Sequence, residues 1–346
     1  MAEISHRALR ELIAGFDSGA GGSVEYFTEM ISAGALLGGG PFEKWYLDAG
    51  PCPDRLVYQL VGSDPGQLER AAALLDGRDC LGIDLNMGCA APAIRRIGAG
   101  IAWMGDIDKA AALAGRVRKA LRRRRFSVKL RLGGPGDREG DFEYLVRFCR
   151  ALEARGVELI TLHPRLAGEK FKRPARWDYV EALRRELGIP VAGNGDIDDA
   201  AELLRRAGGG KAMVGRGAVR RPWIFAEARL AAGGTEGALA GGGEESPAGA
   251  AAAGGLAGGP NLEETGLRFL ELLAQYQPPE FHLSRARRFF NYFCDNLKWG
   301  TYVKNLLNRE ESLGGIAKAW AAYFNGHPEE QRPYSFTLPK LRPTTK

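Results

Sequence analysis

The stretch LGIDLNMGCAAP, residues 81–92, begins as a short, nearly continuous apolar run and ends in a turn that carries a cysteine. Six more apolar runs of similar length flank it along the chain. They are SVEYFTEMIS (23–32), RLVYQLVG (55–62), SVKLRLG (127–133), ELITLHP (158–164), PVAGNGD (190–196) and KAMVGRG (211–217). Strands that are buried on both faces read as continuous apolar runs, so the pattern predicts a parallel sheet.

Segments with helical spacing separate most of these runs. Apolar residues recur three and four positions apart in LERAAALL, IDKAAALAGRVRKALRRR, FEYLVRFCRALEARG, WDYVEALRREL and DDAAELLRRAG. Repeated strand–helix units indicate an α/β fold with a parallel sheet. Seven such units over about 215 residues favour a closed TIM (β/α)8-type barrel over an open sheet.

The predicted barrel is one strand short, and the gap lies at its start. The segment HRALRELIAGF, residues 6–16, has helical spacing and leaves no room before it for a strand. We therefore expect the first strand to be missing from this chain. Because open sheet edges are unfavourable, we also expect the gap to weaken stability and ligand binding.

Composition divides the chain further. Residues 1–231 carry the barrel pattern, whereas 232–261 consist mainly of Gly, Ala, Ser and Glu and predict a flexible linker or insertion. Four amphipathic segments within 262–330 predict a small helical bundle. Residues 331–346 form a tail.

The overall composition, with 45% hydrophobic and 26% charged residues, is typical of a globular protein. No apolar run approaches the roughly 20 residues that span a membrane. Five cysteines without a CxxC pair argue against a disulfide framework or a metal site and favour a cytoplasmic protein. The net charge of +6 weakly favours an anionic partner.

Polar residues gather at the carboxyl ends of the predicted strands, where parallel barrels carry their chemistry. In chain order these are Glu29, Gln59, Asn86 with Cys89, Lys129 with Arg131, His163 with Arg165, Asn194 with Asp196, and Gly215 with Arg216. Since each buried polar group needs a partner, seven such ends in succession are hard to explain by packing alone. They predict a functional site at this end of the barrel.

The last two strand ends, AGNGDI and MVGRGAVRRPW, place glycines directly before helices. Glycine lets the backbone approach a ligand, and helix N-termini offer free N–H groups to a phosphate. Loops after the last two strands commonly form the phosphate site of such barrels. The pair predicts a phosphorylated cofactor.

These motifs together resemble the tRNA-dihydrouridine synthases, in the order of that family and over residues 1 to about 230. The resemblance rests on MAEISHRALREL, TEMIS, YQLVGSDP, IDLNMGCAAP followed by GAG, VKLRLG, LHPR, GNGDI and VGRGAVRRPWIF. It implies an FMN-binding barrel followed by a helical domain, 262–330, that binds tRNA. It also implies the reduction of uridine in tRNA with NADPH as the electron donor.

The resemblance assigns roles to individual residues. It implies that Lys129 and His163 contact the flavin, that Gln59 meets its pyrimidine edge, and that Asn86 lies in the base pocket. The ribityl chain and phosphate would be held by Asn194, Gly195, Asp196, Gly215 and Arg216. Hydride would pass from flavin N5 to uracil C6, and Cys89 would protonate C5. An ordinary thiol has a pKa near 8.5, so it can donate a proton at neutral pH.

Further residues are expected to contact RNA. These are Arg95, Arg96, Arg165, Lys170, Lys172, Arg173, Arg285 and Arg288. The chain departs from the family pattern at Ala90 and Ala93, where proline and lysine are usual. We expect the turn that aims the thiol to be looser as a result, and Arg95 and Arg96 to restore the lost positive charge.

Two alternatives stay open from the sequence. One is a related RNA-binding protein that has lost catalysis, which the altered GCAAP turn and the missing strand would fit. The other is an FMN barrel that reduces a small molecule, which would explain the phosphate loops but not the basic helical region.

Overall fold

The computed structural model describes residues 3–17, 24–133, 141–169, 173–232 and 260–333. Its one sheet has seven parallel strands in sequential order. The strands are β1 (Tyr26–Ser32), β2 (Leu56–Val61), β3 (Gly82–Met87), β4 (Arg125–Arg131), β5 (Leu159–His163), β6 (Val191–Asn194) and β7 (Lys211–Met213). Each lies within or beside a predicted run, so the parallel sheet is confirmed.

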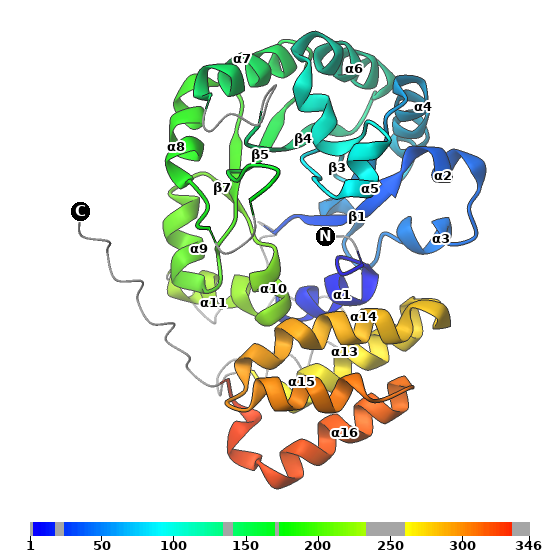
Figure 1. Cartoon of the computed structure of the whole chain (residues 1–346), viewed down its shortest axis with the longest axis vertical. Helices are drawn as coiled ribbons and strands as arrows, with labels where there is room; N and C mark the ends of the chain where they lie inside the picture. Colours follow the sequence, from blue (N-terminus) through cyan, green and yellow to red (C-terminus); the bar gives the residue numbers. More distant parts are fainter. Residues whose placement is uncertain (1–2, 18–23, 134–140, 170–172, 233–259, 334–346) are drawn as a thin grey trace, which may run out of the picture. The chain divides into compact units, whose positions relative to one another are not determined.

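Helices follow the strands and cover the outside of the sheet (Figure 1). In this part of the chain they are α1 (Arg7–Phe16), α2 (Ala33–Gly38), α3 (Glu43–Tyr46), η1 (Pro53–Arg55), α4 (Pro65–Asp76), α5 (Pro92–Arg96), η2 (Gly100–Gly105), α6 (Ile107–Ala120), α7 (Phe142–Glu153), α8 (Trp177–Glu186), α9 (Ala200–Ala207), α10 (Arg216–Arg220) and α11 (Ile224–Ala231). Aspartate begins four of them, α4, α6, α7 and α9. Each aspartate accepts a hydrogen bond from a backbone N–H three residues on, which satisfies a free donor of the first turn.

The sheet is strongly curved, as ion pairs at the amino ends of its strands show. Glu25, just before β1, lies 2.6 Å from Arg125 at the start of β4 and 2.8 Å from Lys211 at the start of β7. In a flat sheet β1 would lie about 14 Å from β4 and about 29 Å from β7, given strand spacings of about 4.8 Å. The sheet therefore curls into the barrel-like shape that the sequence predicts.

Helices fill the gap between β7 and β1, where the sheet is open. Between β7 and β1 no hydrogen-bonded strand pair occurs, and no further strand is found among the described residues. Instead, α1 contacts the last helices of the barrel: Phe16 meets Trp223 edge-to-face at 5.8 Å between ring centroids, and Asp17 lies 2.7 Å from Arg229. Asp17 is buried and also pairs with Arg55 at 3.1 Å.

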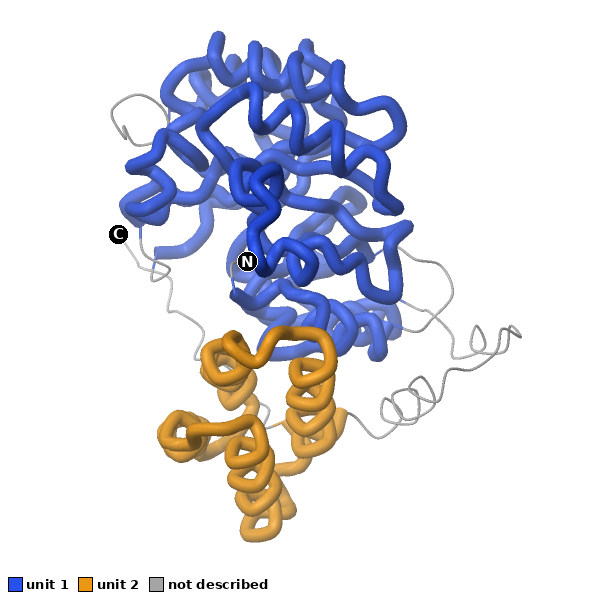
Figure 2. Tube along the Cα trace, turned by 90° about the vertical axis from the view of Figure 1, so that its right-hand side faces the viewer, with its two compact units in different colours: residues 1–242 blue, residues 243–346 orange. Residues whose placement is uncertain are grey.

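The chain divides into two compact units, residues 1–242 and 243–346 (Figure 2). The second unit contains α13 (Leu262–Tyr276), α14 (Pro279–Phe293), η4 (Cys294–Asn296), α15 (Gly300–Asn308), α16 (Leu313–Gly326) and η5 (Pro328–Gln331). Its core is aromatic, with Phe269 stacked on Phe289 and Trp320 packed against Phe290. The helical C-terminal region is thus confirmed, while most of the predicted linker and tail lies outside the described residues.

Replacing Glu25 with glutamine should lower the free energy of unfolding by about 2 kcal/mol. Burial alone would raise the pKa of Glu25, but hydrogen bonds from Arg125 and Lys211 lower it to about 2. A depressed carboxyl pKa stabilises the fold above the unfolded-state value near 4.5, and this stabilisation is lost as the pH falls toward 2. Urea unfolding at pH 7 and pH 4 checks both the size and the trend.

A matched control for Glu25 is Glu181→Gln, which breaks the exposed pair with Arg184. It should change stability by less than about 0.5 kcal/mol. Equal losses in the two variants would contradict the structural role given to Glu25.

Candidate active site

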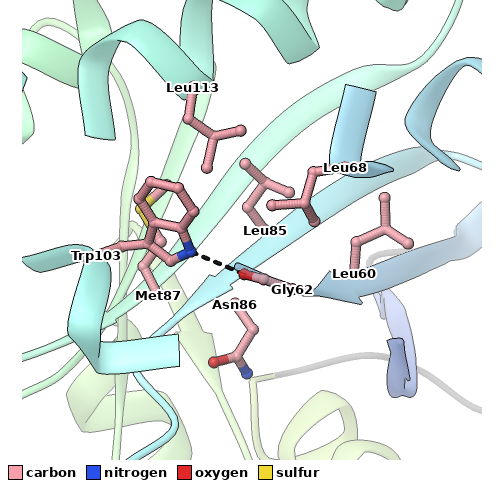
Figure 3. A pocket seen from close by; sticks show the side chains of 8 residues that line it. All are labelled: Leu60, Gly62, Leu68, Leu85, Asn86, Met87, Trp103 and Leu113. Carbon is pink, nitrogen blue, oxygen red and sulfur yellow. Dashed lines mark hydrogen bonds between the residues drawn. The ribbon is translucent and has the colours of Figure 1, made fainter. Parts of the chain in front are cut away.

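The inner face of the curved sheet is polar. Side chains alternate between the two faces of a strand, so Gln59, Asp84, Asn86, Ser127, Lys129, Thr161, His163 and Asn194 point to one side. On the other side, Leu60, Leu85 and Met87 pack against Leu68 of α4 and Leu113 of α6 (Figure 3). Apolar side chains alone could fill a barrel interior. The polar side chains on this inner face therefore indicate a functional site.

Three neighbouring strands share a buried hydrogen-bond network. The Asp84 carboxylate accepts a bond from Ser127 Oγ at 2.6 Å and from Gln59 Nε2 at 2.8 Å. Gln59 Oε1 in turn accepts a bond from Asn86 Nδ2 at 3.0 Å. The strand register makes these contacts possible, because Gln59 and Ser127 both lie directly beside Asp84.

Cys89 lies on the turn after β3 and is half-buried. Asn86 Oδ1 accepts hydrogen bonds from the backbone N–H of Gly88 at 3.2 Å and of Cys89 at 2.8 Å. The carbonyl oxygen of Cys89 accepts a bond from the N–H of Ile101 at 3.0 Å. The turn is therefore held from both sides, although Ala90 occupies the place where the family usually has proline.

The segment η2, which supports this turn, is itself anchored. Trp103 Nε1 donates to the Gly62 carbonyl at the end of β2 at 2.9 Å (Figure 3), and Tyr144 OH donates to the Met104 carbonyl at 2.7 Å. Gly100 has a φ of +60°, and a Cβ there would collide with the Cys89 carbonyl. The GAG sequence thus has a structural reason: it lets η2 approach the cysteine closely.

Lys129 reaches across the inner face of the sheet. Its Nζ donates to Asn194 Oδ1 at 3.1 Å, and Asn194 Nδ2 donates to the Met213 carbonyl at 2.7 Å. Burial lowers the pKa of Lys129 to about 8, against the opposing attraction of Asp84. The lysine is therefore mostly charged at neutral pH, yet it titrates within reach of physiological conditions.

His163, Arg165 and Asp196 form a second cluster, in which His163 and Arg165 are buried and Asp196 is partly exposed. Arg165 donates to both Asp196 oxygens at 2.6 Å and lies 3.0 Å from His163 Nε2. Burial, with the charges of Lys129 and Arg131 next, lowers the pKa of His163 to about 2. His163 is thus a neutral imidazole that binds by hydrogen bonds and does not act as a cation.

The two glycine-containing loops lie side by side. A Cβ at Gly217 would collide with the carbonyl oxygen of Ile197, so only glycine permits this approach. Arg220 on α10 pairs with Asp198 at 2.6 Å, and Arg216 lies 3.8 Å from Asp196. The loops after β6 and β7 therefore form one surface at the carboxyl end of the sheet.

The inner face fits a flavin by the chemistry of its donors and acceptors. Thr161 Oγ1 is buried and has no hydrogen-bond partner among the described residues. It lies beside Lys129 in the strand register and on the same strand as His163. A polar inner face with such a hydroxyl suits a ligand that carries carbonyl and ring N–H groups. The isoalloxazine ring of a flavin carries both.

The residues expected to contact RNA fall into three groups. Exposed residues are Arg95 and Arg96 on α5, Arg173 after β5, and Arg288 on α14. Buried residues are Arg165, 1% exposed, and Arg285, 3% exposed, which donates to Gln277. Lys170 and Lys172 lie outside the described residues.

Sequence reasoning missed two residues that shape this site, Asp84 and Trp103. Asp84 stands two positions before Asn86 in IDLN and therefore shares its face of the strand, which is a signal that alternation alone could have given. For Trp103 the sequence offers no comparable signal, since its partner Gly62 is 41 positions away.

None of the helices in the described part of the chain is long and apolar enough to cross a membrane. Nor do the described residues bring together a group of His, Cys, Asp or Glu side chains that could hold a metal ion.

Comparison with known proteins gives one consistent result. A model of the dihydrouridine synthase (Dus) family matches residues 1–240. A probable tRNA-dihydrouridine synthase from Rhizobium leguminosarum bv. phaseoli is 32% identical over 229 residues, which are 64% of this chain and 68% of that protein. A probable tRNA-dihydrouridine synthase from Rhodobacter capsulatus is 32% identical over 233 residues, which are 66% of this chain and 68% of that protein. The tRNA-dihydrouridine synthase B of Proteus vulgaris is 30% identical over 239 residues, again with coverages of 66% and 68%.

Proposed function

The chain belongs to the dihydrouridine synthase family, and from this premise we propose that it reduces the C5–C6 double bond of uridine in tRNA, with FMN as cofactor and NADPH as electron donor. The observation that carries the proposal is the joint placement of two groups at one end of the barrel. Lys129 lies half-buried on the inner face, and the half-exposed Cys89 is held on the turn after the neighbouring strand.

Lys129 and His163 would contact the flavin, and Gln59 would meet its pyrimidine edge. The ribityl chain and phosphate would be held by Asn194, Gly195, Asp196, Gly215 and Arg216. When bound, FMN supplies hydride to uracil C6. A protonated lysine beside the pyrimidine edge would stabilise the negative charge of the reduced ring.

Cys89 would donate the proton that uracil C5 needs. A thiol can do this at neutral pH without special tuning. Asn86 Oδ1 accepts from the N–H of Cys89 and the N–H of Ile101 donates to its carbonyl, so the backbone of the turn is fixed even with Ala90 in place of proline. This support favours an active enzyme over a relative that has lost catalysis.

A uridine in folded tRNA has to leave its stack to reach such a site. The exposed Arg95 and Arg96 on α5 follow the Cys89 turn closely and are well placed to contact the RNA backbone. Arg173, Arg288 and the helical unit 262–330 would add further contacts. Since Arg165 and Arg285 are buried, we expect them to support neighbouring residues and not to touch RNA.

The proposal is tested with the purified chain, FMN, NADPH and an unmodified tRNA transcript. Nucleoside mass spectrometry should detect dihydrouridine that depends on all three additions. Free uridine and uracil serve as small-molecule controls, and turnover of these without tRNA would favour the small-molecule reductase. A chain that binds tRNA and FMN but forms no dihydrouridine would support the relative that has lost catalysis.

Changing Lys129 to methionine should weaken FMN binding by about 10- to 100-fold, because a charge-assisted hydrogen bond contributes about 1.5–3 kcal/mol. In the unchanged protein, affinity should fall as the pH rises through about 8, where Lys129 loses its proton. The variant should lack this pH dependence. Flavin fluorescence titrations between pH 6.5 and 9.5 measure both effects.

Lys109→Met is the matched control for Lys129, because it removes an exposed lysine whose partner is Asp106 at the start of α6. It should leave the affinity for FMN and its pH dependence unchanged. A persistent pH dependence in the Lys129 variant would contradict the role given to this lysine.

A further inference from the structure

Asp84 is the one charged group at the centre of the buried network on β2, β3 and β4, and the mechanism above does not use it. Its side chain is fully buried, with an exposed fraction of 0%. Its two oxygens accept hydrogen bonds from Ser127 Oγ and Gln59 Nε2. A buried carboxylate costs free energy unless it is well paired, so its presence calls for a reason.

An ionised carboxylate only accepts hydrogen bonds, and this fixes the direction of every bond that follows. Gln59 must turn its Nε2 toward Asp84, so its Oε1 faces Asn86. Asn86 must then present Nδ2 to Gln59, at 3.0 Å, which leaves its Oδ1 for the N–H groups of Gly88 and Cys89. If either amide were reversed, a donor would face a donor or an acceptor would face an acceptor at its neighbours in the network.

We propose that Asp84 is a positioning residue for the Cys89 turn: its charge orients the amides of Gln59 and Asn86, and Asn86 then holds the backbone N–H of Cys89. Asp84 does not touch the reacting atoms. It acts over two hydrogen-bonded side chains, from the floor of the site to the backbone N–H of Cys89. The inference deepens the proposed function, because it concerns the acid of that reaction.

The charge of Asp84 is adjustable near neutral pH. Burial raises its pKa to about 6, although hydrogen bonds from Ser127 and Gln59 and the charges of Lys129 and Arg125 act in the opposite direction. The charged groups that face it, Lys129 and Arg125, both come from β4, and β2 contributes the neutral Gln59. Below pH 6 the protonated carboxyl can donate as well as accept, so it no longer dictates the direction of the Gln59 amide.

His163 does not interfere in this range, because burial holds its pKa near 2. Lys129, whose pKa lies near 8, titrates well above Asp84. A change at Cys89 with a midpoint near pH 6 therefore reports on Asp84.

The backbone amide of Cys89 gives a direct readout. The chain has five cysteines, so protein labelled with ¹⁵N-cysteine gives five amide signals, which single cysteine substitutions assign. The Cys89 signal should shift with pH, with a midpoint near 6, and its amide should lose protection against hydrogen exchange, relative to the intrinsic rate at each pH, as the pH falls below 6. Cys294, in the other compact unit, should not follow this titration.

Asp84→Asn should abolish this titration. Asp76→Asn is the matched control, because it removes another buried carboxylate, whose hydrogen bonds within the described part of the chain come from the backbone N–H groups of residues 122–124. The control should keep the midpoint near 6. A pH-independent Cys89 signal in the unchanged protein, or a titration that persists in Asp84→Asn, would overturn the proposal.

If Asp84→Asn does not fold, Ser127→Ala takes its place. The hydrogen bond from Ser127 lowers the pKa of Asp84, so its loss should raise that pKa. The midpoint of the Cys89 titration should therefore rise by about 0.5–1 pH unit. An unmoved midpoint would again overturn the proposal. These readouts need neither FMN nor tRNA, so a chain that titrates as described but forms no dihydrouridine refutes the proposed function alone.

Discussion

Replacing Cys89 with alanine should lower the rate of dihydrouridine formation by about 10²- to 10⁴-fold, the usual contribution of a well-placed general acid. The side chain that donates the proton is lost, while the hydrogen bonds that the Cys89 backbone makes to Asn86 Oδ1 and accepts from the Ile101 N–H do not depend on it and should persist. Binding of FMN and its reduction by NADPH should therefore stay within about twofold of the unchanged protein. Nucleoside mass spectrometry and flavin absorbance measure the two steps separately.

Cys52→Ala is the matched control for this experiment. Cys52 is also half-exposed, but it lies before β2 and contacts Arg55 away from the polar inner face. Its loss should leave the rate unchanged. Full activity in Cys89→Ala would remove the acid role, and a parallel loss of FMN reduction would show that Cys89 serves the cofactor instead.

The largest expected loss of stability follows from Arg165→Met. Arg165 donates both to Asp196 and to the Arg173 carbonyl, at 2.6 and 2.7 Å, and removing it leaves the Asp196 carboxylate without its main partner. Breaking one side of a buried ion pair costs about 3–5 kcal/mol. Because Asp196 is 31% exposed, the lower end of that range is expected. Urea unfolding of the apoprotein provides the measurement.

Arg173→Met changes an arginine of the same loop whose side chain is 67% exposed, and it should cost less than about 0.5 kcal/mol. The double variant Arg165→Met/Asp196→Asn should recover part of the loss, since the carboxylate that lost its guanidinium partner is then also removed. A loss below about 1 kcal/mol for Arg165→Met, or no recovery in the double variant, would contradict this account of the cluster.

The strands were predictable because each has a local signal. Strands buried on both faces leave runs such as RLVYQLVG and ELITLHP, and the structure places β2 and β5 within them. What no local pattern reveals is the curvature, which depends on contacts such as that between Glu25 and Lys211, 186 positions apart. The sequence could predict the units of the barrel but not the ion pairs that hold their ends together.

The site shows the same division. The polar residues at the strand ends could be recognised in the sequence, and alternation along the strands puts five of them on the inner face: Gln59, Asn86, Lys129, His163 and Asn194. Their partners could not be recognised: Arg165 of the LHPR motif was expected to contact RNA, yet it is buried against Asp196, which follows the adjacent strand. That contact depends on the pairing of β5 with β6 and could not be read from the spacing of the residues.

The altered GCAAP turn is the clearest case. From the sequence, Ala90 predicts a looser turn, because proline would restrict the backbone there. The structure instead holds the turn through the side chain of Asn86 and through η2, which Trp103 anchors to β2. Compensation of this kind is tertiary, so the missing proline alone says little about the aim of the thiol.

The central claim is that a solvent-exchangeable thiol donates the proton to C5 of a uridine in tRNA. The most direct measurement is the reaction in deuterated water with unlabelled NADPH, followed by mass spectrometry of the nucleosides in ordinary water. We expect dihydrouridine that carries deuterium at C5. Absence of dihydrouridine, or dihydrouridine without deuterium at C5, would contradict the account.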